Sequence, residues 1–261
     1  MHPLLTTAVR CARIAGNIIL KHSDQLDRIE VERKGRHDFV SEVDRMAEDE
    51  IIAFVEKTYP DHGIIAEESG ERGANNEYVW IIDPLDGTTN FLHGYPEFAV
   101  SIAIRRRDVL EHGVIYHPMA NELFTSSRGQ GVQVDNRRVR CTTLRTLDDA
   151  LIGTGFPIRD LERLDPWMRS FRALLPRCSG IRRSGSAALD LAYIAAGRLD
   201  GFFEYGLSPW DMAAGVLMIR EAGGLVTDIS GGQDYMQSGN IVAAGPHVMN
   251  PLLSLIRARS A

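Results

Sequence analysis

Apolar residues are spaced differently in successive parts of this chain, and the order of these spacings limits the folds open to it. Residues 4–19 and 43–55 repeat apolar side chains at helical spacing, and Pro60 ends the second repeat. Short runs rich in β-branched and aromatic residues follow, which are typical of strands. The order predicts two amphipathic helices and then a meandering, largely antiparallel sheet. The expected strands cover 64–65, 78–82, 100–104, 114–116, 123–125 and 132–139, the last folded about Asp135-Asn136.

The second part of the chain alternates strands with helices. Strands are expected at 151–152, 202–203, 225–227 and 241–243, and helices at 167–175, 187–196, 212–222 and from 248 onward. We therefore predict an α+β protein with an N-terminal half at 1–144 and a C-terminal α/β half at 145–261. Because no Pro/Gly/Ser-rich linker separates the halves, we expect one compact unit with a shared cleft.

Composition excludes some classes of protein. With 44% hydrophobic and 25% charged residues in 261, the chain is not disordered. It holds three cysteines, an odd number without a Cys-x-x-Cys pair, and no glycosylation sequon, which indicates a reducing compartment. No apolar run approaches the ~18 residues that a membrane span needs, so we predict a cytoplasmic protein. The net charge of −6 predicts no general attraction to nucleic acid or an anionic membrane.

Several common motifs are missing. Gly129-Gln130-Gly131 and Gly153-Thr154-Gly155 lack the third glycine and the acidic partner of a dinucleotide site. The eight histidines include no pair at zinc-ligand spacing, and no Gly-x-Ser-x-Gly turn is present. The sequence therefore favours neither a nucleotide cofactor, nor zinc, nor a serine nucleophile.

Two carboxylates end the predicted strand 78–82, in the segment Asp83-Pro84-Leu85-Asp86-Gly87-Thr88. Pro84 disfavours helical geometry at Asp83 and Gly87 permits a tight turn, so both acids and the Leu85 carbonyl can converge. Carboxylate and carbonyl oxygens suit Mg²⁺ better than zinc or copper. Amides at the following turn could hold a phosphate. The alternative is that both acids are ordinary turn residues.

Two further acids are candidates for the same site. Glu67 follows the apolar run 64–66 and so stands at the end of another strand. Asp211 lies in Ser208-Pro209-Trp210-Asp211, where Ser208 as N-cap and Pro209 at the first helical position would give a helix start without any function. An acid at a helix start can also face a cation, so the two roles are compatible.

These segments together resemble the inositol monophosphatase family. Glu67-Glu68-Ser69, residues 83–91 and Trp210 to Gly215 are similar to its three signature segments, in the same order. Matches at Arg182 to Asp190 and at Phe203-Glu204 extend the likeness over the chain, which is most similar to the bacterial SuhB-type branch. The resemblance implies a layered αβαβα sandwich of the sugar-phosphatase kind, as in inositol monophosphatase and fructose-1,6-bisphosphatase, and a homodimer.

The resemblance also implies a set of ligands and a reaction. It assigns one Mg²⁺ to Glu67, Asp83 and the Leu85 carbonyl, a second to Asp83, Asp86 and Asp211, and a looser third ion near Glu67. Lithium inhibition is implied as well. The predicted reaction is hydrolysis of myo-inositol 1-phosphate by a metal-activated water without a covalent intermediate, with Glu67 and Thr88 orienting and deprotonating that water. The expected substrate contacts are Leu85, Asp86, Gly87, Thr88, Arg182, Gly185, Ser186, Ala187, Glu204 and Asp211.

Two alternatives stay open. The same chemistry could act on another small sugar or nucleotide phosphate, although an acid at Glu204 accepts hydrogen bonds from a polyol and repels a second phosphate. The SuhB-type resemblance also implies a role as a partner of RNA polymerase in antitermination complexes. Arg105-Arg106-Arg107 and Arg182-Arg183 are the candidate contacts, although short arginine clusters are usually solvated or paired. No membrane association and no specific DNA binding are expected.

Overall fold

A large sheet in the middle of the first half organises the chain in the computed structural model, which describes residues 2–35, 38–158 and 160–257. It has eight strands in the order β10-β9-β8-β7-β6-β5-β3-β4. All neighbours are antiparallel except β3 and β5, which run parallel. The predicted meander is therefore confirmed. The strands are β3 (Gly63–Ala66), β4 (Gly70–Arg72), β5 (Tyr78–Asp86), β6 (Ala99–Arg106), β7 (Val109–His117), β8 (Glu122–Ser127), β9 (Gly131–Val134) and β10 (Arg137–Val139).

Two helices cover one face of this sheet, as their apolar stripes predict. α1 (Pro3–Ser23) packs on β6 and β7, and α2 (Glu42–Thr58) packs on β5 and on α1. α2 begins with a capping box between Ser41 and Asp44. None of the described helices combines the length and the apolarity that a bilayer crossing requires. A separate two-stranded ribbon, β1 (Val31–Gly35) and β2 (Asp38–Ser41), leads into α2.

Two buried helices separate the large sheet from a second one. α5 (Ala187–Ala195) and α6 (Pro209–Glu221) pack against each other, with α6 on β6 and β7. Below them lies a five-stranded sheet in the order β12-β11-β13-β15-β14. Its outer face is covered by α4 (Leu164–Leu174) and α8 (Met249–Arg257). The strands are β11 (Leu151–Thr154), β12 (Gly180–Arg182), β13 (Gly201–Glu204), β14 (Leu225–Thr227) and β15 (Ile241–Ala244).

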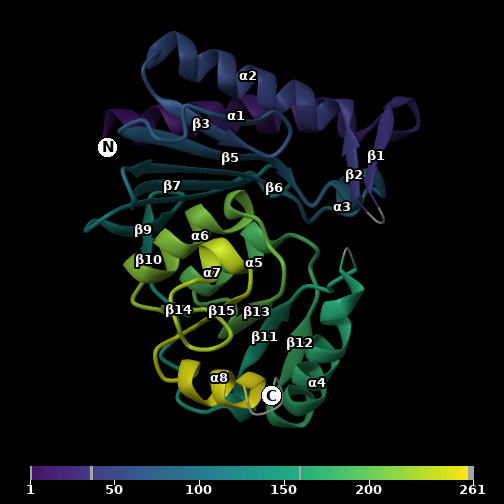
Figure 1. Cartoon of the computed structure of the whole chain (residues 1–261), viewed down its shortest axis with the longest axis vertical. Coiled ribbons are helices and arrows are strands. Elements are labelled where there is room, and N and C mark those ends of the chain that lie inside the picture. The colour runs from purple at the N-terminus through teal and green to yellow at the C-terminus, as the bar shows by residue number, and fades with distance from the viewer. Residues whose placement is uncertain (1, 36–37, 159, 258–261) are drawn as a thin grey trace.

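The layers are therefore helix, sheet, helix, sheet and helix, stacked from α1 and α2 to α4 and α8 (Figure 1). Apolar side chains fill the spaces between successive layers. This arrangement confirms the predicted αβαβα sandwich. The two sheets lie within 63–139 and 151–244, on either side of the boundary predicted between residues 144 and 145, and that boundary itself stays a prediction.

Turns and helix faces mostly agree with the expectations from the sequence, and a few of them differ. Asp135 and Asn136 adopt φ of 47° and 65°, as a tight hairpin turn requires. Met46 fits the apolar spacing of the helix predicted at 43–55, yet its side chain is 42% exposed. The short helix α3 (Thr88–Leu92) starts at the turn where the amides of residues 87–89 were expected to begin a helix turn. The short helix α7 (Tyr235–Ser238) was not predicted, since it is too short for a periodic pattern.

Candidate functional site

Six segments meet at a cavity of about 150 Å³ between the layers. They are the residue after β3, the end of β5 with its turn into α3, the end of β11 with the loop that follows it, the N-termini of α5 and α6, and the end of β13. Every predicted metal ligand lines this cavity: Glu67, Asp83, Leu85, Asp86 and Asp211. The predicted substrate contacts Gly87, Thr88, Gly185, Ser186, Ala187 and Glu204 line it as well.

Glu67 and Asp83 are brought together by strand pairing. β3 and β5 run parallel with Ala66 opposite Ile82, so the two acids directly follow neighbouring positions at the same edge of the sheet. The Glu67 amide continues the pairing, since it donates a 3.2 Å hydrogen bond to the Ile82 carbonyl. Two carboxylates at adjacent strand ends thus face one space, as the sequence predicts.

The turn at the end of β5 fixes the positions of the residues that follow Asp83. The Leu85 amide donates a 3.0 Å hydrogen bond to Oδ1 of Asp83. Gly87 has φ of 97° and caps α3, and a Cβ there would lie 3.0 Å from the carbonyl oxygen of Glu97. Glycine is thus required at this position by both conformation and space.

Asp83, Asp86 and Asp211 form the acidic centre of the cavity. One carboxylate oxygen from each lies within 4.8 Å of the others. Asp83 is buried, and its Oδ2 receives no hydrogen bond in the described part of the chain. Burial, followed by the charges of Glu67, Asp86 and Asp211, raises the pKa of Asp83 well above its usual range. Such repulsion among carboxylates is relieved by cations, so these residues fit hard divalent ions.

Asp86 is held by the N-terminus of α5. Its Oδ2 accepts hydrogen bonds from the Ser186 hydroxyl at 2.6 Å and from the Ala188 amide at 2.7 Å. Ser186 is at the same time the N-cap of α5. The carboxylate therefore lies at the positive end of a helix and is fixed by residues one hundred positions further along the chain.

Asp211 stands both at a helix start and in the acidic cluster. It is the third residue of α6, after Ser208 at the N-cap and Pro209 at the first helical position. Its Oδ2 accepts a 2.7 Å hydrogen bond from the Ser208 amide, while it also belongs to the acidic cluster. The helix start thus fixes the direction of this carboxylate.

Asp44 on α2 was not predicted as a site residue. The Thr88 hydroxyl donates hydrogen bonds to Oδ1 of Asp44 at 2.8 Å and to the Leu85 carbonyl at 3.2 Å. Burial raises the pKa of Asp44, against the hydrogen bonds that Ser41 and Thr88 donate to it. In the sequence, Asp44 was explained fully as part of a helix cap.

Glu48, one turn further along α2, supports the Glu67 segment and was also missed. Its carboxylate accepts hydrogen bonds from the Glu68 amide at 2.9 Å and the Ser69 amide at 2.7 Å. Glu48 is only 1% exposed. A buried polar residue on an otherwise apolar helix face was the available signal.

The other end of the cavity is formed by Glu204 and Asp190. Burial and the surrounding carboxylates raise the pKa of Glu204 well above its usual range, and burial raises that of Asp190 to about 8. A Cβ on Gly155 would lie 1.8 Å from Oε1 of Glu204, so only glycine leaves room for this carboxylate. Asp190 was quoted in the sequence motif but not assigned to the site.

Arg182 does not line the cavity. It ends β12, is exposed, and its side chain donates a hydrogen bond to the backbone carbonyl of Ile181. The next residue, Arg183, lines the cavity and places its guanidinium 5.2 Å from the ring centre of Phe156. Successive side chains of an extended segment point to opposite sides, so Arg182 and Arg183 point in opposite directions, and the predicted contact was one residue off.

The cluster Arg105-Arg106-Arg107 is largely paired. Arg106 forms a 2.7 Å ion pair with Glu77, Arg107 lies 3.9 Å from the same carboxylate, and Arg105 donates to the Ala74 carbonyl. These three arginines thus stand at the end of β6 and interact mainly with groups of their own chain.

The layered sandwich, with a carboxylate cluster at the end of β5, has the α+β architecture of the sugar-phosphatase fold. The family model described as the inositol monophosphatase family matches residues 1–260, and the chain belongs to this family. It is 52% identical to Nus factor SuhB of Escherichia coli strain K12 over 258 residues, which cover 98% of this chain and 97% of that protein. Membership of the family supports phosphatase activity.

Solved structures agree with this assignment. The extragenic suppressor protein SuhB from Bartonella henselae superposes with a TM-score of 0.95 at 44% identity, covering 98% of this chain and 99% of that one. Inositol monophosphatase from Anabaena (Nostoc) superposes with a TM-score of 0.88 at 36% identity, covering 98% and 96%. The SuhB-type resemblance is therefore confirmed.

Proposed function

We propose that this protein hydrolyses phosphate monoesters with the help of Mg²⁺, and that myo-inositol 1-phosphate is its most suitable substrate. The observation that carries the proposal is the convergence of Asp83, Asp86 and Asp211 within 4.8 Å. They are joined by Glu67 and by the Leu85 carbonyl in the same cavity. The carboxylates that line the cavity would repel a phosphate dianion, so the site requires cations before it can bind this substrate.

The donor set fits two ions, and a third near Glu67. Glu67, Asp83 and the Leu85 carbonyl would hold the first, and Asp83, Asp86 and Asp211 the second. The buried Oδ2 of Asp83 has no hydrogen-bond donor in the described part of the chain, which supports Asp83 as a ligand. When bound, such ions lower the pKa of water and stabilise the charge on the leaving oxygen.

Thr88 and Glu67 would orient the attacking water. Because the Thr88 hydroxyl donates a hydrogen bond to Asp44, its oxygen lone pairs are left to accept a hydrogen bond from the attacking water. Glu67 lines the same cavity and would accept the one proton that this water loses. The geometry thus supports Asp44 as the group that positions Thr88.

The substrate would be held from two sides. The Gly87 and Thr88 amides at the start of α3 would bind phosphate oxygens, and the backbone of 185–187 would contact the alcohol part. Glu204 would accept hydrogen bonds from its hydroxyls, which favours a polyol over a second phosphate. Arg183 replaces Arg182 as the proposed cationic contact, because it lines the cavity.

The test is phosphate release from inositol 1-phosphate with and without Mg²⁺. A small panel adds fructose-1,6-bisphosphate and 3′-phosphoadenosine 5′-phosphate. The proposal expects Mg²⁺-dependent release that is lost in Asp83→Asn and retained in Asp108→Asn, a matched change at a fully exposed turn. If the folded protein releases no phosphate from any of these at millimolar Mg²⁺, the catalytic proposal fails. Faster turnover of a bisphosphate contradicts the polyol assignment alone.

We also propose a second role as a homodimeric partner of the transcription machinery in antitermination. The support is 52% identity over nearly the full length of both chains to a protein named Nus factor SuhB. In a host that lacks its own SuhB protein, Asp83→Asn separates the two roles. Full complementation by this variant supports a role that is independent of catalysis, whereas loss of complementation assigns the cellular function to the phosphatase. Light scattering tests the dimer, and lithium titration of the activity tests the predicted inhibition.

A further inference from the structure

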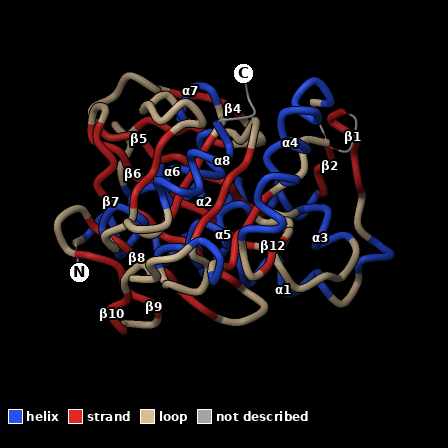
Figure 2. Tube along the Cα trace, turned by 90° about the horizontal axis from the view of Figure 1, so that it is seen from below, coloured by secondary structure: helices blue, strands red, loops and turns tan. Residues whose placement is uncertain are grey.

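A second hollow, of about 690 Å³, lies on the large sheet apart from the catalytic cavity. β9, which contributes to its wall, and α3, at the catalytic cavity, lie on opposite sides of the molecule in Figures 1 and 2. Its volume is in the usual range of small-molecule sites. A ligand bound in this hollow would therefore not touch the carboxylate cluster.

The hollow lies where α1 begins and leaves part of the sheet uncovered. His2, the N-cap of α1, and Leu5 in its first turns both line it. Residues paired across the strands form rows on this face of the sheet, and two rows change from apolar to polar toward β9. They are Ile102, Val114, Thr125 and Gln133, and Ile104, His112, Ser127 and Gly131. The polar ends of these rows form the floor of the hollow.

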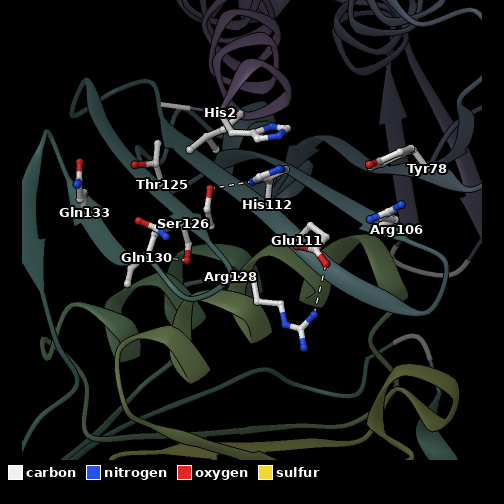
Figure 3. A pocket seen from close by; sticks show the side chains of 13 residues that line it. His2, Tyr78, Arg106, Glu111, His112, Thr125, Ser126, Arg128, Gln130 and Gln133 are labelled. Atoms are coloured by element: carbon white, nitrogen blue, oxygen red, sulfur yellow. Dashed lines mark hydrogen bonds and ion pairs between the residues drawn. The ribbon is translucent and has the colours of Figure 1, made fainter.

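Two polar groups on this floor are buried and lack a partner. His112 is 7% exposed, and its Nδ1 is paired with the Ser127 hydroxyl at 2.8 Å, whereas its Nε2 has no hydrogen bond within the described residues. Thr125 is 6% exposed, and in the same part of the chain its hydroxyl has no hydrogen bond either. Figure 3 shows both side chains among those that line the hollow. Because a buried polar group without a partner costs free energy, both groups favour a ligand that hydrogen-bonds to them.

The charged groups of the wall are already paired with each other or with neighbours. Arg106 forms a 2.7 Å ion pair with Glu77, and Arg128 lies 3.4 Å from Glu111. Burial lowers the pKa of His112 to about 4, so its ring is uncharged near neutral pH. The hollow therefore offers hydrogen bonds with little net charge, which favours an uncharged ligand.

The rest of the wall combines aromatic rings with amide groups. His2 is exposed, and its ring stacks on that of His112 with centroids 4.5 Å apart (Figure 3). Gln130 and Gln133 add side-chain amides, which make no hydrogen bond to any residue that the structure describes. An amide presents donors and an acceptor side by side, as neighbouring hydroxyls of a ring do. The C–H face of such a ring can pack on an imidazole.

We infer that this hollow binds an uncharged ring compound rich in hydroxyls, which is a cyclic polyol or a monosaccharide. Its hydroxyls would hydrogen-bond to Thr125, to Gln133 and to Nε2 of His112, and its C–H groups would pack on His2. This ligand gives partners to the buried polar groups and needs no opposite charge. The catalytic cavity, under the function proposed above, takes a phosphate with cations, so the two sites would select different forms of such compounds.

The test is ligand-observed NMR by saturation transfer, with myo-inositol and D-glucose added to the full-length protein in EDTA. At least one of the two is expected to bind with millimolar or tighter affinity. Thr125→Val/Gln133→Leu removes a hydroxyl and an amide with little change in shape. Since each neutral hydrogen bond accounts for roughly two- to tenfold in affinity, the double variant should bind about tenfold more weakly or worse. The control Thr143→Val/Gln237→Leu makes the same changes at exposed positions elsewhere and should bind like the wild type.

Glu204→Gln separates this hollow from the catalytic cavity. Binding that persists in Glu204→Gln and is lost in the double variant places the ligand in the hollow. Binding that is lost in Glu204→Gln places it in the catalytic cavity and overturns the inference. The inference also fails if neither compound binds, if the double variant is unaffected, or if glucose 6-phosphate or glucuronate binds as tightly as glucose.

Two further measurements keep the outcome independent of folding and of catalysis. The melting temperature of the ligand-free double variant should match that of the wild type, because Thr125→Val keeps a β-branched residue in its strand. If it is lower, Gln133→Leu alone, at a half-buried position, repeats the test with an expected loss of roughly two- to tenfold. Phosphate release should be unchanged in these variants, so failure here leaves the proposed catalytic function intact.

Discussion

The hydroxyl of Thr88 lies 2.8 Å from Oδ1 of Asp44, and this contact joins the start of α3 to the start of α2. Asp44 also accepts a 2.9 Å hydrogen bond from the Ser41 amide, so the carboxylate is fixed by its own helix cap. The proton of Thr88 is thereby directed away from the cavity, and its oxygen lone pairs face the proposed water. A helix start in one layer thus supports chemistry at the edge of the sheet below.

Replacement of Thr88 by valine should lower kcat by roughly 10²–10³ with little change in KM, because the group that orients water is lost while the shape is kept. Thr88→Ser should restore most of the activity, since it keeps the hydroxyl. Steady-state kinetics on inositol 1-phosphate measure both. Equal loss in the serine and valine variants would indicate that packing, rather than the hydroxyl, matters here.

Mg²⁺ should stabilise the folded protein through the carboxylate cluster. At about one hundred times its dissociation constant, a ligand that binds only the folded state adds about 2.7 kcal/mol to the free energy of unfolding. For a chain of this size we expect the melting temperature to rise by about 5 °C. Asp83→Asn should abolish this rise and Asp108→Asn should keep it, as calorimetry can show. An unchanged rise in Asp83→Asn would place the ions elsewhere.

Ser186→Ala should weaken both α5 and the site. The variant loses the 2.6 Å hydrogen bond to Asp86 and the N-cap of the helix, which together should cost about 1–2 kcal/mol of unfolding free energy. Urea denaturation measures this cost. Ser186→Thr, which keeps an N-cap hydroxyl, serves as the matched control. A loss of stability without any change in Mg²⁺ affinity would limit the serine to a structural role.

The stability of the fold should fall between pH 6.5 and pH 4 because of His112. Burial, and then the charge of His2, lowers the pKa of His112 from 6.5 to about 4. The folded state therefore binds fewer protons than the unfolded state in this window, and stability is lost as the pH falls. Between pH 7.5 and pH 5 this group should account for about 2 kcal/mol. The free energy of unfolding, measured by denaturation at pH 7.5 and pH 5, should depend less on pH in His112→Gln than in the wild type. Equal pH dependence in the two proteins would contradict the assignment.

The sequence predicts well what is determined locally. The Ser208-Pro209 start of α6 and the Asp135-Asn136 hairpin depend on neighbouring residues only, and both occur as expected. The positions of Glu67 and Asp83 at strand ends could also be expected, since each acid directly follows a run of apolar residues, whereas the parallel pairing of β3 with β5 was not predicted. Motifs and short spacings therefore located the carboxylate cluster.

The contacts between distant segments could not be predicted in the same way. Asp44 already had a sufficient explanation as a capping residue, and nothing in its neighbourhood indicates Thr88, which is 44 residues away. The direction of Arg183 depends on where β12 ends, which a pattern cannot place to within one residue. Met46 is exposed although its spacing fits the apolar stripe. Each of these features depends on tertiary packing.

The origin of Asp211 has a consequence for the order in which the protein acquires its site. Asp83 and Asp86 belong to β5 in the first sheet, whereas Asp211 and the Ser186 hydroxyl that holds Asp86 come from helices in the second half of the chain. During synthesis the chain emerges from its N-terminus, so the first sheet can form while the cluster still lacks these groups. A nascent or truncated chain that ends before α6 would carry the two strand-end acids without the third. If this cluster holds metal ions as proposed, their tight uptake would begin only when nearly the whole chain has been made, and it would mark the completion of folding.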